Sequence, residues 1–177
     1  MRVVGGLYKG RVLVPFDGDR IRPTSDKVRE SFYNIVRDKV YGCNFLDLFC
    51  GTGAMGIEAL SRGASFVQLN DFSKDSLTVV KKNLEKLKIT DNVKITNFDA
   101  TGCLKNSIQK FDIIYIDPPY KSDLGIKVLP FVGEALTDDG IAVYESETPF
   151  NERVSGLEIY DTRKYGRAYL TFFKKGE

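Results

Sequence analysis

The sequence predicts a doubly wound α/β domain built on a mostly parallel sheet of seven strands. Three observations favour it: apolar runs alternate with amphipathic segments from residue 44 onward, a glycine-rich turn follows the first run, and the last two runs have no helix between them. The chain has 177 residues, 42% of them hydrophobic and 28% charged, which is typical of one globular domain. We therefore expect residues 1–177 to form a single domain.

Two local patterns define the first 43 residues. Short apolar runs separated by glycines up to residue 14 predict a β-hairpin, so residues 1–24 are expected to be a hairpin extension of the domain. After Pro23 the spacing predicts a helix with Thr24 or Ser25 as its N-cap. Its apolar face contains Val28, Phe32, Ile35 and Val36.

From residue 44 onward the pattern predicts strands and helices in turn. Strands are expected at residues 45–49, 66–70, 93–98, 113–117, 141–145, 157–160 and 168–173. Helices are expected at residues 54–62, 73–87, 101–108 and 124–136, where Pro130 must start or kink the last one. The alternation calls for a parallel sheet covered on both faces, and the last two strands predict an antiparallel C-terminal hairpin.

Composition excludes several classes of protein. The chain has no histidine, which removes Ser-His-Asp triads, His-ligated metals and histidine general bases. Its three cysteines are an odd number without CxxC spacing, so we expect neither a disulfide framework nor a metal site. No apolar run of 18 residues or signal-peptide core is present, so we expect a cytoplasmic protein without membrane contact.

The charge is unevenly distributed along the chain. Residues 1–39 carry nine Lys and Arg against five Asp and Glu, and the last fifteen residues are basic again. This pattern predicts a polyanion-binding rim, although a solvated surface would look the same. The candidate contacts are Arg2, Lys9, Arg11, Arg22, Arg29, Arg163, Lys164 and Arg167.

A glycine-rich turn directly follows the strand at residues 45–49. Gly51, Gly53 and Gly56 match the GxGxxG pattern of dinucleotide sites, although such a turn can be purely structural. Asp47, inside the strand, would repel a pyrophosphate and suits a cationic or amino-bearing ligand better. Polar residues end the next two strands, where they could bind ribose and an adenine amino group. The predicted cofactor-binding residues are Asp47, Phe49, Gly51, Gly53, Asn70, Asp71, Asp99 and Ala100.

The strand at residues 113–117 delivers the tetrapeptide Asp117-Pro118-Pro119-Tyr120, predicted to be catalytic, to the carboxyl edge of the sheet. The two prolines end the strand and fix a rigid loop. The Asp117 carboxylate and the Pro118 carbonyl could accept hydrogen bonds from one planar NH₂ group, while Tyr120 stacks on the attached ring. The acceptors would increase the electron density on that nitrogen, so no strong base is required.

These motifs together resemble a known enzyme class. Residues 47–53 (DLFCGTG), Asp99 and residues 117–120 (DPPY) look like a class I S-adenosylmethionine-dependent amino-methyltransferase, whose fold is Rossmann-like. Residues 2–6 (RVVGG), 22–32 (RPTSDKVRESF) and 56–64 (GIEALSRGA) resemble the bacterial 16S ribosomal RNA (guanine-N2)-methyltransferase family over essentially the whole chain. That family usually shows Glu where this chain has Asn70 followed by Asp71, so either residue could meet the ribose.

The resemblance implies a reaction and a partner. It implies S-adenosylmethionine as cofactor and methylation of the exocyclic N2 of a guanine in small-subunit RNA. The partner would be 16S rRNA or an assembling small ribosomal subunit, the enzyme is expected to be a monomer, and the basic rim would contact RNA. We expect deletion of the first 22 residues to weaken RNA binding and to spare cofactor binding.

Other functions remain open at this point. The DPPY motif also occurs in adenine-N6 methyltransferases of nucleic acids and in protein glutamine-N5 methyltransferases, which generally carry further domains, whereas here 44 residues precede the first sheet strand. A cytosine-C5 enzyme would need a cysteine nucleophile, and neither Cys50 nor Cys103 lies near a plausible base site. An NAD-binding oxidoreductase is the alternative from a different class. The nucleotide modified and the form of the RNA substrate are not indicated.

Overall fold

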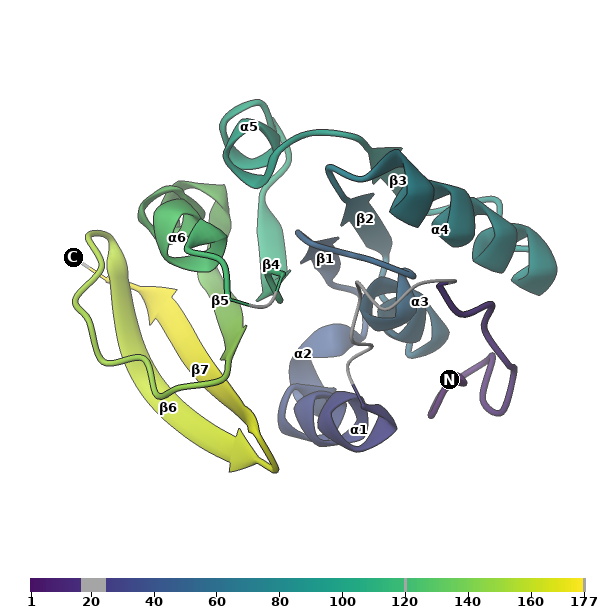
Figure 1. The fold of residues 1–177 in the computed structure, drawn as a ribbon, viewed down its shortest axis with the longest axis horizontal. Coiled ribbons are helices and arrows are strands. Elements are labelled where there is room, and N and C mark those ends of the chain that lie inside the picture. The colour runs from purple at the N-terminus through teal and green to yellow at the C-terminus, as the bar shows by residue number, and fades with distance from the viewer. Residues whose placement is uncertain (17–24, 120, 177) are drawn as a thin grey trace.

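A seven-stranded sheet in the order β3-β2-β1-β4-β5-β7-β6 forms the centre of the molecule (Figure 1). A computed structural model describes residues 1–16, 25–119 and 121–176. β7 is antiparallel to both of its neighbours, and the other sheet pairings are parallel, which confirms the predicted topology. The strands are β1 (Asn44–Asp47), β2 (Phe66–Asn70), β3 (Val93–Thr96), β4 (Phe111–Ile116), β5 (Leu136–Ser146), β6 (Leu157–Tyr165) and β7 (Ala168–Lys175).

Helices cover both faces of the sheet, as a doubly wound fold requires. One face packs against α1 (Asp26–Ile35), α2 (Arg37–Val40), α3 (Ala54–Ser61) and α4 (Lys74–Leu87). The other face packs against α5 (Ala100–Lys105) and α6 (Leu124–Ala135). Adjacent strand residues point to opposite faces, so Phe45 and Ile113 lie in the first core while Leu46 and Ile114 lie in the second.

Side-chain hydrogen bonds cap the beginnings of α1 and α4. Ser25 accepts a hydrogen bond from the Val28 N–H at 3.2 Å, which confirms it as the N-cap of α1. Ser73 accepts from the Ser76 N–H at the start of α4.

Pro130 lies inside α6, so the helix continues through it, and β5 follows directly at Leu136. The four-residue helix α2 was not predicted, since it is too short to show a periodicity.

Residues 1–16, which we call the N-terminal arm, are the described part of the predicted hairpin, and they pair in the antiparallel manner that a hairpin requires. The described arm contains only one antiparallel bridge, between Arg2 and Val12. The Val3 N–H donates to the Arg11 carbonyl at 2.9 Å and the Leu13 N–H to the Met1 carbonyl at 3.1 Å, on either side of this bridge. Other backbone donors of the arm bond to α3: Glu58 accepts the N–H of Val4 and Gly5, and the Ser61 hydroxyl accepts the N–H of Tyr8. The arm therefore runs along α3, as the purple trace shows (Figure 1).

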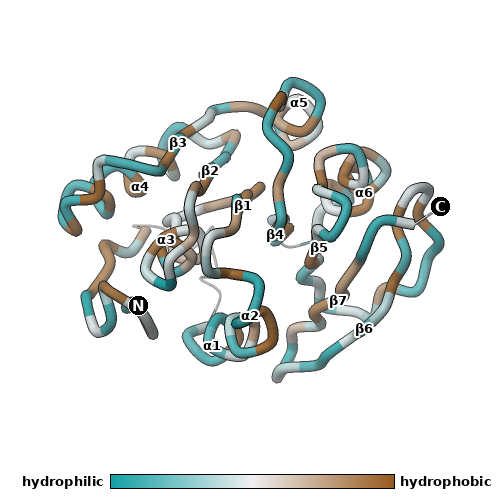
Figure 2. Tube along the Cα trace, turned by 180° about the vertical axis from the view of Figure 1, so that it is seen from behind, coloured by the Kyte–Doolittle hydropathy of each residue, from teal (hydrophilic) through white to brown (hydrophobic). Residues whose placement is uncertain are grey.

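The distribution of hydropathy follows these layers. Hydrophobic residues concentrate in the central strands and on the helix faces that meet the sheet, while the outer strand β6 is mostly hydrophilic (Figure 2). No helix among the described residues is long and apolar enough to cross a bilayer.

Candidate cofactor and substrate site

A pocket of about 680 Å³ opens at the carboxyl edge of the sheet, beside the adjacent strands β1 and β4. The strand order reverses between these strands, and doubly wound sheets bind ligands at such a point. All but one of the predicted cofactor residues line it, together with most of the predicted catalytic loop. The predicted residues in its wall are Asp47, Phe49, Gly51, Asn70, Asp71, Asp99, Ala100, Asp117, Pro118 and Pro119.

Gly53 is the predicted cofactor residue that does not line this pocket. It is the N-cap of α3 and has φ +81°, a conformation that side chains with a Cβ rarely adopt. An added Cβ would also lie 3.3 Å from a methyl carbon of Val80. Gly53 therefore determines the shape of the loop and makes no wall of the pocket.

Asp47 is a buried carboxylate at the end of β1. Its Oδ2 accepts a hydrogen bond from the Gly56 N–H at 3.1 Å, and only 2% of the residue is exposed. Burial raises the pKa of Asp47 to about 7; the bond from Gly56 opposes this shift and the charge of Asp71 adds to it. A buried carboxylate with a raised pKa favours a ligand that brings a cationic group into the pocket.

Asn70 and Asp71, at the end of β2, have different tasks. The buried Asn70 amide donates to the carbonyls of Leu48 and Phe98, both at 3.1 Å, and accepts from the Thr96 hydroxyl and the Phe98 N–H. All of these are bonds within the protein. Asp71 is partly exposed and accepts from the N–H of Gly51 at 2.9 Å and of Ser73 at 2.8 Å, with one oxygen each. Of the two, Asp71 retains the acceptor capacity that ribose hydroxyls need.

Two exposed aromatic residues of the pocket were missed by the sequence analysis. Phe72 is 78% exposed and Phe98 is 47% exposed, and both line the pocket. Exposed rings beside Asp71 and Asp99 offer an apolar surface to a planar ligand. The signal that could have found them is their position, since each adjoins a polar residue at a strand end.

Asp99 combines a structural and a pocket-lining role. Its Oδ1 accepts the Gly102 N–H at 2.8 Å, so it is the N-cap of α5, and it also lines the pocket.

The loop after β4 presents its first three residues to the pocket. Asp117 and Pro118 are partly buried and Pro119 is exposed, while Tyr120 lies outside the described residues. The Pro119 carbonyl accepts hydrogen bonds from the N–H and hydroxyl of Ser122. Among the described residues, none donates a hydrogen bond to the Pro118 carbonyl.

The three cysteines offer no nucleophile. All three are buried, and burial raises the pKa of the Cys50 thiol well above its usual value and that of Cys103 to about 11. Thiolate is therefore scarce at neutral pH. This finding agrees with the exclusion of a cytosine-C5 mechanism.

Arg29 is wrongly predicted as an RNA contact. Its side chain is fully buried, bonded to Asp26 at 2.7 Å and to the Arg2 carbonyl, and its Nε lies 3.6 Å from Glu58. Arg29 lies on the polar face of α1, and the N-terminal arm covers this face at Arg29. Arg29 therefore supports the arm and cannot reach a phosphate.

The other predicted rim residues occupy different parts of the surface. Lys9 lies at the turn of the arm. The residues before it donate hydrogen bonds to Ser61, at the end of α3 that is remote from the pocket, so Lys9 does not border the pocket mouth. Arg163 and Lys164 lie near the end of β6 and Arg167 lies in the β6–β7 turn, which the register with β5 sets at the carboxyl edge. Arg2 and Arg11 are exposed on the arm, and Arg22 lies outside the described residues.

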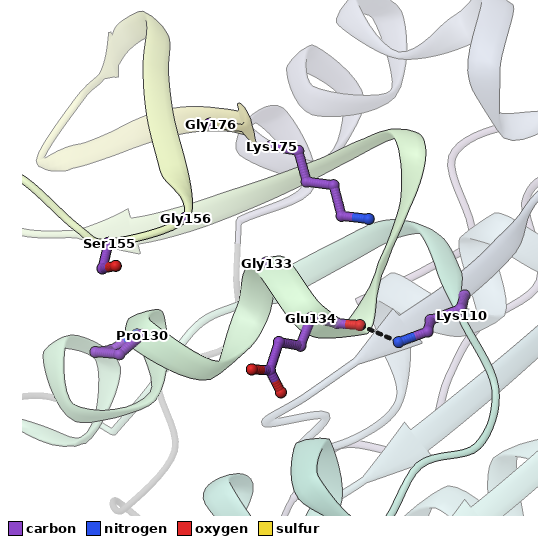
Figure 3. A pocket seen from close by; sticks show the side chains of 8 residues that line it. All are labelled: Lys110, Pro130, Gly133, Glu134, Ser155, Gly156, Lys175 and Gly176. Carbon is purple, nitrogen blue, oxygen red and sulfur yellow. Dashed lines mark hydrogen bonds between the residues drawn. The ribbon is translucent and has the colours of Figure 1, made fainter.

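A second pocket, of about 500 Å³, lies at the opposite edge of the sheet (Figure 3). Lys110 and Lys175 border it, and the Lys110 ammonium donates to the Glu134 carbonyl. None of the residues predicted to bind a ligand lines it. Within the described part of the chain, no group of three or more Cys, Asp or Glu side chains could hold a metal ion.

Comparisons with known proteins give a consistent assignment. The model of the family described as conserved hypothetical protein 95 matches residues 1–174. The chain is 35% identical to YlbH of Bacillus subtilis over 99% of both chains. It is 32% identical to the ribosomal RNA small subunit methyltransferase D of Escherichia coli K12, over 83% of this chain and 75% of that one. The solved Escherichia coli structure of yhhF covers 99% of this chain and 97% of its own, with a TM-score of 0.87 and 26% identity.

Proposed function

This chain belongs to the conserved hypothetical protein 95 family, and on that premise we propose that it is an S-adenosylmethionine-dependent methyltransferase that modifies a guanine N2 in small-subunit ribosomal RNA. The fold is that of a Rossmann-like class I methyltransferase. The relative from Haemophilus influenzae with the same methyltransferase D name, 31% identical over 90% of this chain, supports the RNA substrate. The chain is proposed to act in the cytoplasm as a monomer.

The residues of the main pocket fit S-adenosylmethionine. A buried carboxylate with a raised pKa, Asp47, favours the positive charge that this cofactor carries. Asp71 is proposed to accept the ribose hydroxyls, and Asp99 the adenine amino group. Phe72 and Phe98 offer apolar surface for the adenine ring. When bound, the cofactor supplies an electrophilic methyl group on a sulfonium centre.

The catalytic proposal rests on the acceptors at the end of β4. The Asp117 carboxylate and the Pro118 carbonyl would accept hydrogen bonds from the two hydrogens of the guanine amino group, which directs the nitrogen lone pair away from the ring. Because the two prolines hold the loop rigid, both acceptors are in position before the substrate binds. The nitrogen loses its proton only after the new N–C bond forms, so no residue acts as a strong base. Tyr120 is proposed to stack on the flipped base.

The observation that carries the proposal is the meeting of Asp47, Asp71, Asp99 and Asp117 in one pocket at the switch point of the sheet. The test is transfer of labelled methyl groups to small ribosomal subunits, and separately to free 16S rRNA, from cells lacking this chain. Nucleoside analysis should find the label in N2-methylguanosine. Label in N6-methyladenosine, or none in RNA, would contradict the proposal.

A further inference from the structure

One buried side chain, Asn83 on α4, joins the N-terminal arm to the glycine-rich loop. Its Oδ1 accepts the Val14 N–H at 2.6 Å, and its Nδ2 donates to the Val14 carbonyl at 3.2 Å. The same Nδ2 donates to the Thr52 carbonyl at 3.0 Å. Asn83 is fully buried. Its side-chain amide pairs with both the N–H and the carbonyl of Val14, as a neighbouring β-strand residue would.

Both ends of the arm reach the main pocket. Met1 and Phe16 line it, and the Thr52 hydroxyl lies 3.8 Å from the Met1 sulfur. The Leu13 N–H donates to the Met1 carbonyl at 3.1 Å, which ties the beginning of the arm to its last part. The arm is therefore part of the pocket wall beside the glycine-rich loop.

The middle of the arm is anchored away from the pocket. Gly6 has φ +74°, and a Cβ there would lie 1.8 Å from the Ser61 carbonyl oxygen, so the arm contacts α3 as closely as backbone permits. Glu58 accepts two arm N–H groups at 2.7 and 2.8 Å. These anchors hold the turn of the arm, whereas Asn83 holds the part that enters the pocket.

We propose that Asn83 is a positioning residue for the cofactor pocket, acting through Val14 and Thr52 to hold the arm against the glycine-rich loop. The proposal rests on the proposed function, because it takes the ligand of this pocket to be S-adenosylmethionine. It also changes the expectation for the arm. Deletion of the first 22 residues should weaken cofactor binding as well as RNA binding, since Met1 and Phe16 leave the pocket with them.

Calorimetry with S-adenosylhomocysteine tests the proposal directly. Asn83→Ala should raise Kd about tenfold, close to the net value of one hydrogen bond. Asn83→Asp keeps the acceptor for Val14 and loses both donated bonds, so Kd should also rise. The matched control is Leu87→Ala, one turn further along α4 in the core, which should lower Tm and leave Kd unchanged.

Steady-state kinetics separates positioning from loss of structure. Asn83→Ala should raise the KM for S-adenosylmethionine and leave both kcat and the KM for RNA within about twofold, because the arm touches the cofactor side of the pocket. Phe16→Ala should give the same pattern. Combined with Asn83→Ala, its effect should be less than additive, since both changes remove the same wall.

The outcomes distinguish the two proposals. If wild type binds S-adenosylhomocysteine and both Asn83 variants bind it equally well, the positioning role is overturned. It is also overturned if Leu87→Ala weakens binding as much as Asn83→Ala at an equal loss of Tm. A wild-type chain that binds no S-adenosylhomocysteine contradicts the proposed function itself.

Discussion

The Asp71 carboxylate accepts a hydrogen bond from the Gly51 N–H at 2.9 Å, which ties the end of β2 to the glycine-rich loop after β1. The neighbouring Asn70 points into the protein and has its amide occupied by four bonds. Asn70 therefore holds the strand ends together, and Asp71 is the residue proposed to accept the ribose hydroxyls.

Substitution of these two residues should separate affinity from stability. Asp71→Ala should weaken S-adenosylhomocysteine binding by about 1.5–3 kcal/mol, the value of a hydrogen bond to a charged group. Asn70→Ala should instead lower the free energy of unfolding by about 1–3 kcal/mol, because its buried partners lose their bonds. Calorimetry and denaturant titration on both variants check this, and the reverse pattern would assign the ribose to Asn70.

The buried Asp47 should make cofactor affinity depend on pH. Its pKa in the free protein is about 7, and a cationic ligand binds better to the ionised carboxylate. Affinity for S-adenosylhomocysteine, whose amino group is protonated in this range, should therefore rise as the pH increases through 7 and level off above it. Asp47→Asn should remove the rise, whereas a wild-type affinity that is flat with pH would exclude this role for Asp47.

The same pKa has a consequence for folding. Between its ordinary pKa of 3.8 and about 7, Asp47 keeps its proton in the folded state and loses it in the unfolded state. The free energy of unfolding should therefore fall as the pH rises through this window. Denaturant titrations of wild type and Asp47→Asn should differ in slope there, and parallel curves would contradict the shift.

Arg29→Ala should lower the free energy of unfolding and leave the affinity for RNA unchanged. Removing this guanidinium leaves Glu58 as a buried charge with less compensation, which costs about 3–5 kcal/mol. Chemical denaturation measures the loss. A stable Arg29→Ala protein whose RNA affinity has fallen would restore Arg29 as a surface contact.

Arg167 provides the opposite case at the β6–β7 turn. Arg167→Ala should change the free energy of unfolding by about 0.5 kcal/mol or less, as surface substitutions usually do. If Arg167 contacts a phosphate, the variant should reduce the slope of log affinity against log salt by about 0.7–0.9. RNA binding across a salt series checks this, and an unchanged slope would remove the turn from the interface.

The fold was predictable because its signals are local. β2 was predicted at the observed residues, 66–70, and Ser25 was one of two expected caps. The pocket residues followed from one rule, that the carboxyl ends of parallel strands meet at one edge. Arg29 could not be placed correctly, since its burial depends on Glu58 and on an arm that packs across α3.

The same limit applies to Asn83 and to the packing of the arm against α3. A single Asn in an amphipathic helix looks like a solvated residue until its partners, Val14 and Thr52, are known. The glycines of the arm predicted tight turns, and Gly6 does begin one, since the Lys9 N–H donates to its carbonyl at 3.2 Å. The close contact of Gly6 with α3 was not predicted. Such roles arise from contacts distant in sequence, which local patterns do not contain.

Methyl transfer by Asp117→Ala tests the central claim most directly. With saturating S-adenosylmethionine and small subunits from cells lacking this chain, its kcat should fall by about 10²–10³, the usual effect of losing one preorganised group, while S-adenosylhomocysteine binds as to wild type. An Asp117→Ala enzyme that methylates its RNA at the wild-type rate would contradict the account.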